Sequence, residues 1–184
     1  MGQTKEKNEI LEWIKAIIIA LIFFFIIKFF FVTPVAVSGE SMMPTIEDGE
    51  RLIVNKIGYK LGDLDRYDVI VFQDSDNKKL IKRVIGLPRE HIAYKDKQLY
   101  VNGEPQKEPY LSNLNKYHNA GLTEDFTLEE YTNQDKIPEG YVFVLGDNRQ
   151  NSKDSRMIGL IPMDEIIGTT NFVWWPWNEI GAIE

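Results

Sequence analysis

A long apolar run and a series of short apolar segments divide the chain into two parts. Residues 13–32, WIKAIIIALIFFFIIKFFFV, are apolar on every face of a helix, with Lys15 and Lys28 near the two ends. A helix of this length extends about 30 Å, which is the thickness of the hydrocarbon core of a bilayer. We therefore predict one transmembrane helix over residues 13–32.

Two other interpretations of this run are less favoured. Residues 35–37 (VAV) are similar to the cleavage site of a secretory signal peptide, but the run is longer than the apolar region of such peptides. A core helix would carry a polar face, and this run has none. Three lysines lie within the first 15 residues, and between there and Arg51 the only cation is Lys28. This bias predicts a cytoplasmic N-terminus at residues 1–12 and an extracytoplasmic domain at residues 33–184.

The rest of the chain carries short segments rich in Val, Ile, Tyr and Phe, bounded by Gly, Pro, Asp and Asn, a pattern typical of strands. No long amphipathic helix follows the apolar run, although residues 163–167 suggest one helical turn. Residues 104–140 are polar with weak periodicity, so we interpret them as an insertion or long loop. The predicted fold class is mainly β: one N-terminal transmembrane helix and an antiparallel β-domain with an inserted segment. The predicted strands are 51–57, 68–73, 80–87, 91–95, 98–103, 141–147 and 169–175.

Composition excludes several classes of site. The net charge is −7, with 28 acidic and 21 basic residues, which argues against a nucleic-acid partner. The chain has no cysteine, so disulfides, thiolate metal sites and a cysteine nucleophile are excluded. His91 and His118 are the only histidines, too few for a His-rich zinc site. We predict no metal or cofactor, and a Ser-His-Asp triad would have to use one of these two histidines.

Two segments carry candidates for nucleophilic chemistry. Ser41 lies in VSGESMMPTI, directly after the apolar run, although Ser, Gly and Pro together are also typical of a simple turn. Lys82 lies in an apolar strand and shares a face with Leu80 and Val84. Burial would lower the pKa of this lysine, as a general base requires, whereas most strand lysines face solvent.

A third segment, GDNRQNSKDSRMIG at 146–159, follows a predicted strand and is dense in polar groups that could form a closed hydrogen-bond network. A solvated loop is the simpler interpretation. A calcium loop is disfavoured, because Arg149 would occupy a ligand position and the required glycine and terminal glutamate are missing.

In order and spacing, these segments resemble the bacterial type I signal peptidase family over nearly the whole chain. The matching segments are SGESMMPT around Ser41, KRVIGLP from Lys82, GDNRQNSKDSR from Gly146, RYDVIVF at 66–72 and VNGEP at 101–105. The single anchor and short insertion are similar to the Gram-positive-type branch. The resemblance implies a membrane-bound serine endopeptidase that removes signal peptides from exported preproteins. It implies no cofactor.

The resemblance also implies a Ser-Lys dyad, in which Ser41 attacks the scissile carbonyl and neutral Lys82 takes its proton, forming an acyl-enzyme. Ser152 would hydrogen-bond the lysine amine, Asp154 and Arg156 would form an ion pair behind the site, and Asp147 would belong to the same network. Some members carry an oxyanion-stabilising serine two residues before the nucleophile. Gly39 stands there in this chain, and Ser38 is one position off.

The family cleaves after small residues at the first and third positions before the scissile bond. Shallow apolar pockets for them are expected from Val35, Val37, Met42 and Ile81, with the substrate bound as an added strand. Each of these four residues has an ordinary core role as its alternative. The expected partners are exported preproteins and membrane lipid, at the cell membrane.

The cluster of Trp174, Trp175 and Trp177 fits either the lipid interface or a packed corner of the β-domain. Two other functions compete with the peptidase. A self-cleaving repressor-type Ser-Lys hydrolase would normally carry a DNA-binding domain. A non-catalytic binding module would typically lose Ser41 or Lys82.

Overall fold

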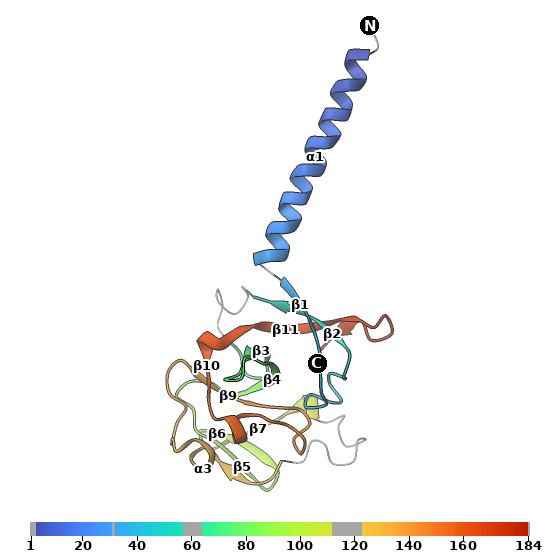
Figure 1. Cartoon of the computed structure of the whole chain (residues 1–184). Coiled ribbons are helices and arrows are strands. Elements are labelled where there is room, and N and C mark those ends of the chain that lie inside the picture. The colour runs from blue at the N-terminus through green and yellow to red at the C-terminus, as the bar shows by residue number, and fades with distance from the viewer. Residues whose placement is uncertain (1–2, 31, 57–63, 112–122, 184) are drawn as a thin grey trace.

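The computed structural model describes residues 3–30, 32–56, 64–111 and 123–183. Helix α1 (Gln3–Phe30) projects from a β-domain that holds two antiparallel sheets (Figure 1). The strand order of the main sheet is β1-β2-β11-β3-β4-β9-β10, with β12 paired to β11. These strands are β1 (Val32–Ala36), β2 (Arg51–Asn55), β3 (Val69–Gln73), β4 (Lys79–Gly86), β9 (Tyr141–Leu145), β10 (Ile161–Pro162), β11 (Ile166–Trp175) and β12 (Gly181–Ala182).

The apolar side chains of α1 are exposed along its described part, with Trp13 72% and Phe23 61% accessible. By length and apolar character together, none of the helices within the described residues qualifies as a membrane span. The transmembrane helix over residues 13–32 therefore stays a prediction.

The predicted β character is confirmed, since a strand overlaps each predicted segment and every strand pair is antiparallel. The last predicted segment is longer than expected, because β11 begins at Ile166. The helical turn expected over 163–167 is the 3₁₀ helix η2 (Met163–Glu165), which ends where β11 begins. Helices α3 (Leu128–Thr132) and α4 (Ser155–Ile158) are short.

A second sheet lies between β4 and β9 in the sequence. Its order is β7-β6-β5-β8, formed by β5 (Ile92–Lys95), β6 (Gln98–Val101), β7 (Glu104–Gln106) and β8 (Phe126–Thr127). The segment that leaves the main sheet thus begins at β5 and not at residue 104. Ile92 and Leu99 from this sheet pack in one core cluster with Ile85 and Phe143 from the main sheet. Residues 112–122 of the predicted insertion lie outside the described residues.

Strand β4 is buried on both faces from Ile81 to Gly86. Its residues enter three different core clusters, through Ile81, Val84 and Ile85. Lys82 and Arg83 are consequently 2% and 4% exposed. The sequence therefore places two cations at the centre of the domain, where each needs a polar partner.

Removing a side chain from the cluster that joins the two sheets should destabilise the whole β-domain. Phe143→Ala deletes a fully buried ring that lies 5.8 Å from the ring of Phe126, centroid to centroid. We expect the free energy of unfolding to fall by about 3–5 kcal/mol, measured by urea denaturation. Phe172→Ala is the control, because that ring is 39% exposed; equal losses for the two variants would contradict the assignment of this core.

Candidate active site

The loop that carries Ser41 joins β1 to β2 and is fixed at both ends. The Val37 amide donates to the Glu50 carbonyl (2.8 Å), which extends the β1–β2 ladder into the loop. Met42 and Ile46 are buried in the core beneath it. Because its apolar residues point inward, the loop turns tightly and leaves Ser41 half-buried at the surface of the core.

The structure brings Ser41 and Lys82 together from segments that are far apart in the sequence. The distance between Ser41 Oγ and Lys82 Nζ is 2.7 Å, and Nζ also donates to the Ile81 carbonyl (2.8 Å). Burial lowers the pKa of Lys82 to about 8, although the negative charges of Asp154 and Asp147 oppose the shift. A neutral amine that touches a hydroxyl can accept its proton, which is the geometry of a general base and a nucleophile.

A cavity of about 290 Å³ opens beside this pair. All four residues expected to bind substrate line it: Val35, Val37, Met42 and Ile81. The other lining residues are Pro34, Ala36, Ser38, Gly39, Lys79, Leu80, Ser41 and Lys82. The cavity therefore lies between β1 and the beginning of β4. Within the described residues β1 pairs only with β2, so it is an edge strand of the main sheet.

Asp147 is fully buried and pairs with the arginine next to Lys82. Arg83 donates to it through both Nε (2.9 Å) and Nη2 (2.7 Å), a bidentate ion pair. The Arg83 guanidinium also lies 4.1 Å from the centroid of the Tyr110 ring. Sequence reasoning missed Arg83 as a partner, although a second cation inside an apolar strand was the available signal.

Asp154 and Arg156 form the expected ion pair, with Nη2 2.8 Å from Oδ2 and Nε 2.8 Å from Oδ1. Asp154 is also the N-cap of α4 and accepts from the amides of Gly146 (3.1 Å) and Arg156 (3.3 Å). This carboxylate has no exposed surface. It therefore ties the start of α4 to the end of β9, directly behind the Ser41 loop.

Ser152 does not make the hydrogen bond to Lys82 that was expected. Its Oγ is buried without a hydrogen-bond partner among the described residues. The side chain packs instead against Gly146, where a Cβ would overlap both the Ser152 hydroxyl and the Ser41 carbonyl oxygen. In the part of the chain that the structure describes, the two hydrogen bonds of the lysine amine are to Ser41 Oγ and the Ile81 carbonyl.

Gly39 has a φ of 107°, a conformation that disfavours any side chain. Its amide donates to Asp48 Oδ1 (2.7 Å), which fixes the turn before Ser41. A serine at this position would be strained, so the departure from the family pattern follows from the backbone of this loop.

Within the described residues, neither a histidine base near the cavity nor a cluster of metal-binding side chains offers an alternative to the Ser41–Lys82 pair. His91 precedes β5 and is not among the residues that line the cavity, and His118 lies outside the described residues. No group of three or more His, Asp or Glu side chains in the described ranges could hold a metal ion.

The tryptophans divide between packed and exposed positions. Arg51 lies over the rings of Trp174 (5.7 Å) and Trp175 (5.9 Å), and the Trp174 indole nitrogen is buried. Trp177 is 78% exposed. Of the two interpretations of this cluster, the lipid interface and a packed corner of the β-domain, the packed corner describes the position of Trp174.

Comparison with known proteins gives a consistent result. The family described as signal peptidase, peptidase S26, matches residues 10–175. A signal peptidase IB of Staphylococcus aureus (strain COL) is 48% identical over 179 residues, covering 94% of this chain and 93% of its own. A signal peptidase I of Bacillus caldolyticus is 46% identical over 154 residues, which cover 83% of this chain and 85% of that protein. The crystal structure of a signal peptidase I from Enterococcus faecalis V583 matches with a TM-score of 0.55 and 41% identity, covering 59% of this chain and 97% of that one.

Arg156→Ala should destabilise the domain, because it leaves the fully buried carboxylate of Asp154 without its counter-charge. We expect a loss of about 3–5 kcal/mol in the free energy of unfolding, measured by thermal and urea unfolding. Arg89→Ala is the matched control, since the Arg89–Glu139 pair is 81% and 62% exposed and should contribute little. An unchanged unfolding midpoint for Arg156→Ala would show that this pair does not stabilise the fold.

Proposed function

The chain belongs to the S26 family of bacterial type I signal peptidases, and on this premise we propose that it cleaves preproteins as a membrane-bound Ser-Lys endopeptidase. The observation that carries the proposal is the 2.7 Å contact between Ser41 Oγ and a lysine amine that is 2% exposed. Family membership indicates the substrate class. The contact places a hydroxyl nucleophile, Ser41, beside a candidate general base, Lys82.

In the proposed reaction, Ser41 Oγ attacks the scissile carbonyl carbon while its proton passes to Lys82 Nζ. The ammonium then gives a proton to the leaving amine, and an acyl-enzyme on Ser41 remains. Water, deprotonated by the same amine, attacks the ester and releases the signal peptide. The backbone N–H of Ser41 is the proposed donor to the oxyanion.

The cavity supports the proposed preference for small residues. An extended substrate would add to the open edge of β1 and run beside the beginning of β4. Its side chains at the first and third positions before the cut would then face Val35, Val37, Met42 and Ile81. Large side chains at these positions would meet buried core residues, since all four are at most 9% exposed.

Residues 13–32 are proposed to anchor the enzyme in the cell membrane, with residues 1–12 in the cytoplasm and the β-domain outside. The apolar run and the distribution of lysines support this orientation. Helix α1 ends at Phe30 and β1 begins at Val32, so the cavity-lining strand follows the anchor almost directly.

Activity should rise with pH as Lys82 loses its proton. With a pKa of about 8 in the free enzyme, kcat/KM is expected to increase about tenfold per pH unit below pH 7 and to level off above pH 9. Ser41→Ala and Lys82→Arg should be inactive, because the first lacks the nucleophile and the guanidinium of the second does not deprotonate in this range. Lys95→Arg, at an exposed position in β5, is the control. Robust cleavage by Lys82→Arg would falsify the dyad and direct attention to His91 and His118.

The anchor should matter for efficiency and not for chemistry, because every proposed catalytic residue follows Val32. A fragment that begins at Thr33 is expected to cut a peptide with small residues before the scissile bond, and to cut a membrane-inserted preprotein far more slowly than the full chain. Both rates can be measured beside the Ser41→Ala fragment. A folded fragment without any peptide hydrolysis would count against this division of roles.

A further inference from the structure

Asn148 is the residue through which the loop after β9 holds the nucleophile. Its backbone N–H donates to the Ser41 carbonyl (3.1 Å), and its side-chain Nδ2 donates to the Glu40 carbonyl (3.1 Å). Gly146 lies against the same Ser41 carbonyl, too closely for any Cβ. The position of the Ser41 backbone therefore follows the position of residues 146–148.

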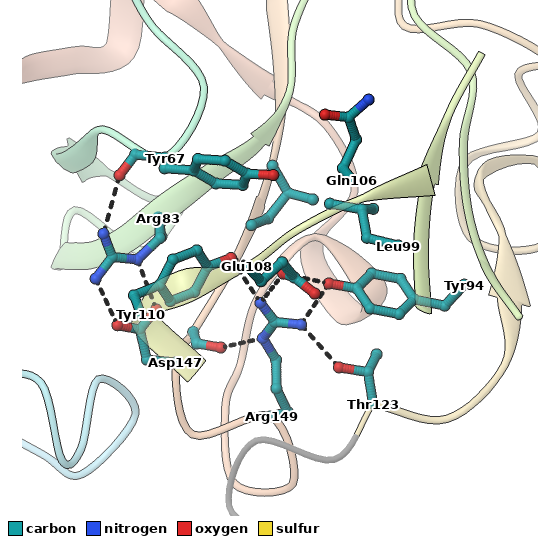
Figure 2. A network of polar contacts seen from close by, with 12 residues as sticks. Tyr67, Arg83, Tyr94, Leu99, Gln106, Glu108, Tyr110, Thr123, Asp147 and Arg149 are labelled. Atoms are coloured by element: carbon teal, nitrogen blue, oxygen red, sulfur yellow. Dashed lines mark hydrogen bonds and ion pairs between the residues drawn. The ribbon is translucent and has the colours of Figure 1, made fainter. Parts of the chain in front are cut away.

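Arg149, which directly follows residues 146–148, stabilises the conformation of this loop. Its Nε donates to the Gly146 carbonyl (3.0 Å), which closes the loop on itself. Its own carbonyl accepts from Arg156 Nη2 (2.8 Å). The side chain has no exposed surface, and its guanidinium contacts Glu108, Tyr94 and Thr123 (Figure 2).

Glu108 is the carboxylate that neutralises Arg149 (Figure 2). Its Oε1 accepts from Arg149 Nη2, from the Tyr94 hydroxyl and from the Tyr110 hydroxyl, each at 2.6 Å. Both hydroxyls also accept from Arg149, and Thr123 Oγ1 accepts from its Nη1 (2.7 Å). Burial raises the pKa of both tyrosines, so they stay protonated and donate to the carboxylate.

This network reaches Ser41 through a short series of contacts, from Glu108 to Arg149, to the Gly146 carbonyl and to Asn148. Glu108 follows β7, in the segment that separates β4 from β9, and its side chain is 8% exposed. A buried guanidinium is tolerated only with a paired charge and satisfied donors. Loss of the carboxylate charge would leave Arg149 buried without a paired charge, and Arg149 is bonded to the Gly146 carbonyl of the loop that holds Ser41.

We propose that Glu108 is a positioning residue for Ser41, acting through Arg149 and the loop of residues 146–148. The second sheet then has a role in the reaction, because it supplies the charge that holds the nucleophile loop. This inference rests on the proposed function of Ser41 as nucleophile.

The test compares Glu108→Gln with Glu90→Gln in the full chain, each assayed for kcat and KM on one preprotein and for thermal unfolding. Glu90 is a matched control. Its side chain pairs with Arg66 at 2.6 Å and is 16% exposed, but the carboxylate accepts from Arg66 and from the Leu87 amide, not from residues 146–149. We expect Glu108→Gln to lower kcat about tenfold, with KM within twofold. Glu90→Gln should lower the unfolding midpoint while its kcat stays within about twofold of the wild-type value.

A double-mutant cycle with Asn148→Ala separates positioning from general destabilisation. If Glu108 acts through the loop, the losses in kcat from Glu108→Gln and Asn148→Ala should not add. Should Glu108→Gln fail to fold, Tyr110→Phe removes one hydrogen bond from the carboxylate and should lower kcat about threefold. An unchanged kcat in a folded variant, an equal loss in Glu90→Gln, or fully additive effects would overturn the inference. Activity that survives Ser41→Ala in the same assay would instead overturn the proposed function.

Discussion

The contact between the Ser41 hydroxyl and the Lys82 amine imposes two demands that the fold must meet together. The amine of Lys82 has to be shielded from water, because otherwise it stays protonated. The hydroxyl has to reach this amine from the loop between β1 and β2, whereas the lysine lies on β4. Strand β4 meets the first demand because it is covered on both faces around Lys82. The buried residues Met42 and Ile46 meet the second, because they fix the Ser41 loop on the core.

Burial alone does not determine the pKa of Lys82, because nearby charges act on it as well. Two fully buried carboxylates, Asp147 and Asp154, lie close enough to favour the ammonium form. Each carboxylate is engaged by the guanidinium of an arginine, Arg83 or Arg156, through two nitrogens. These pairs offset the negative charge near the amine, and Asp154 still accepts from backbone amides. The ion pairs therefore serve the acidity of the lysine as well as the stability of the domain.

Short segments rich in Val, Ile, Tyr and Phe predicted the strands, and a lysine inside an apolar strand indicated Lys82 as a candidate base, a role that the family resemblance then implied. Other parts of the site were beyond sequence reasoning. Glu108 stands in a polar stretch with weak periodicity, and its contact with Arg149 depends on how the second sheet packs against the first. A family resemblance transfers residue types and not contacts, so it could not foresee that the Ser152 hydroxyl forms no hydrogen bond to Lys82 in the structure.

Strand β1 lies at an edge of the main sheet, and one of the residues it presents to the cavity is Pro34. A proline nitrogen has no hydrogen to donate, so it is accommodated in a strand where it faces away from the neighbouring strand. The open edge of β1 therefore offers a carbonyl at this position without the matching N–H. An edge with an interrupted ladder is a poor template for a second copy of itself. Pro34 thus disfavours edge-to-edge pairing of two copies of the chain at β1.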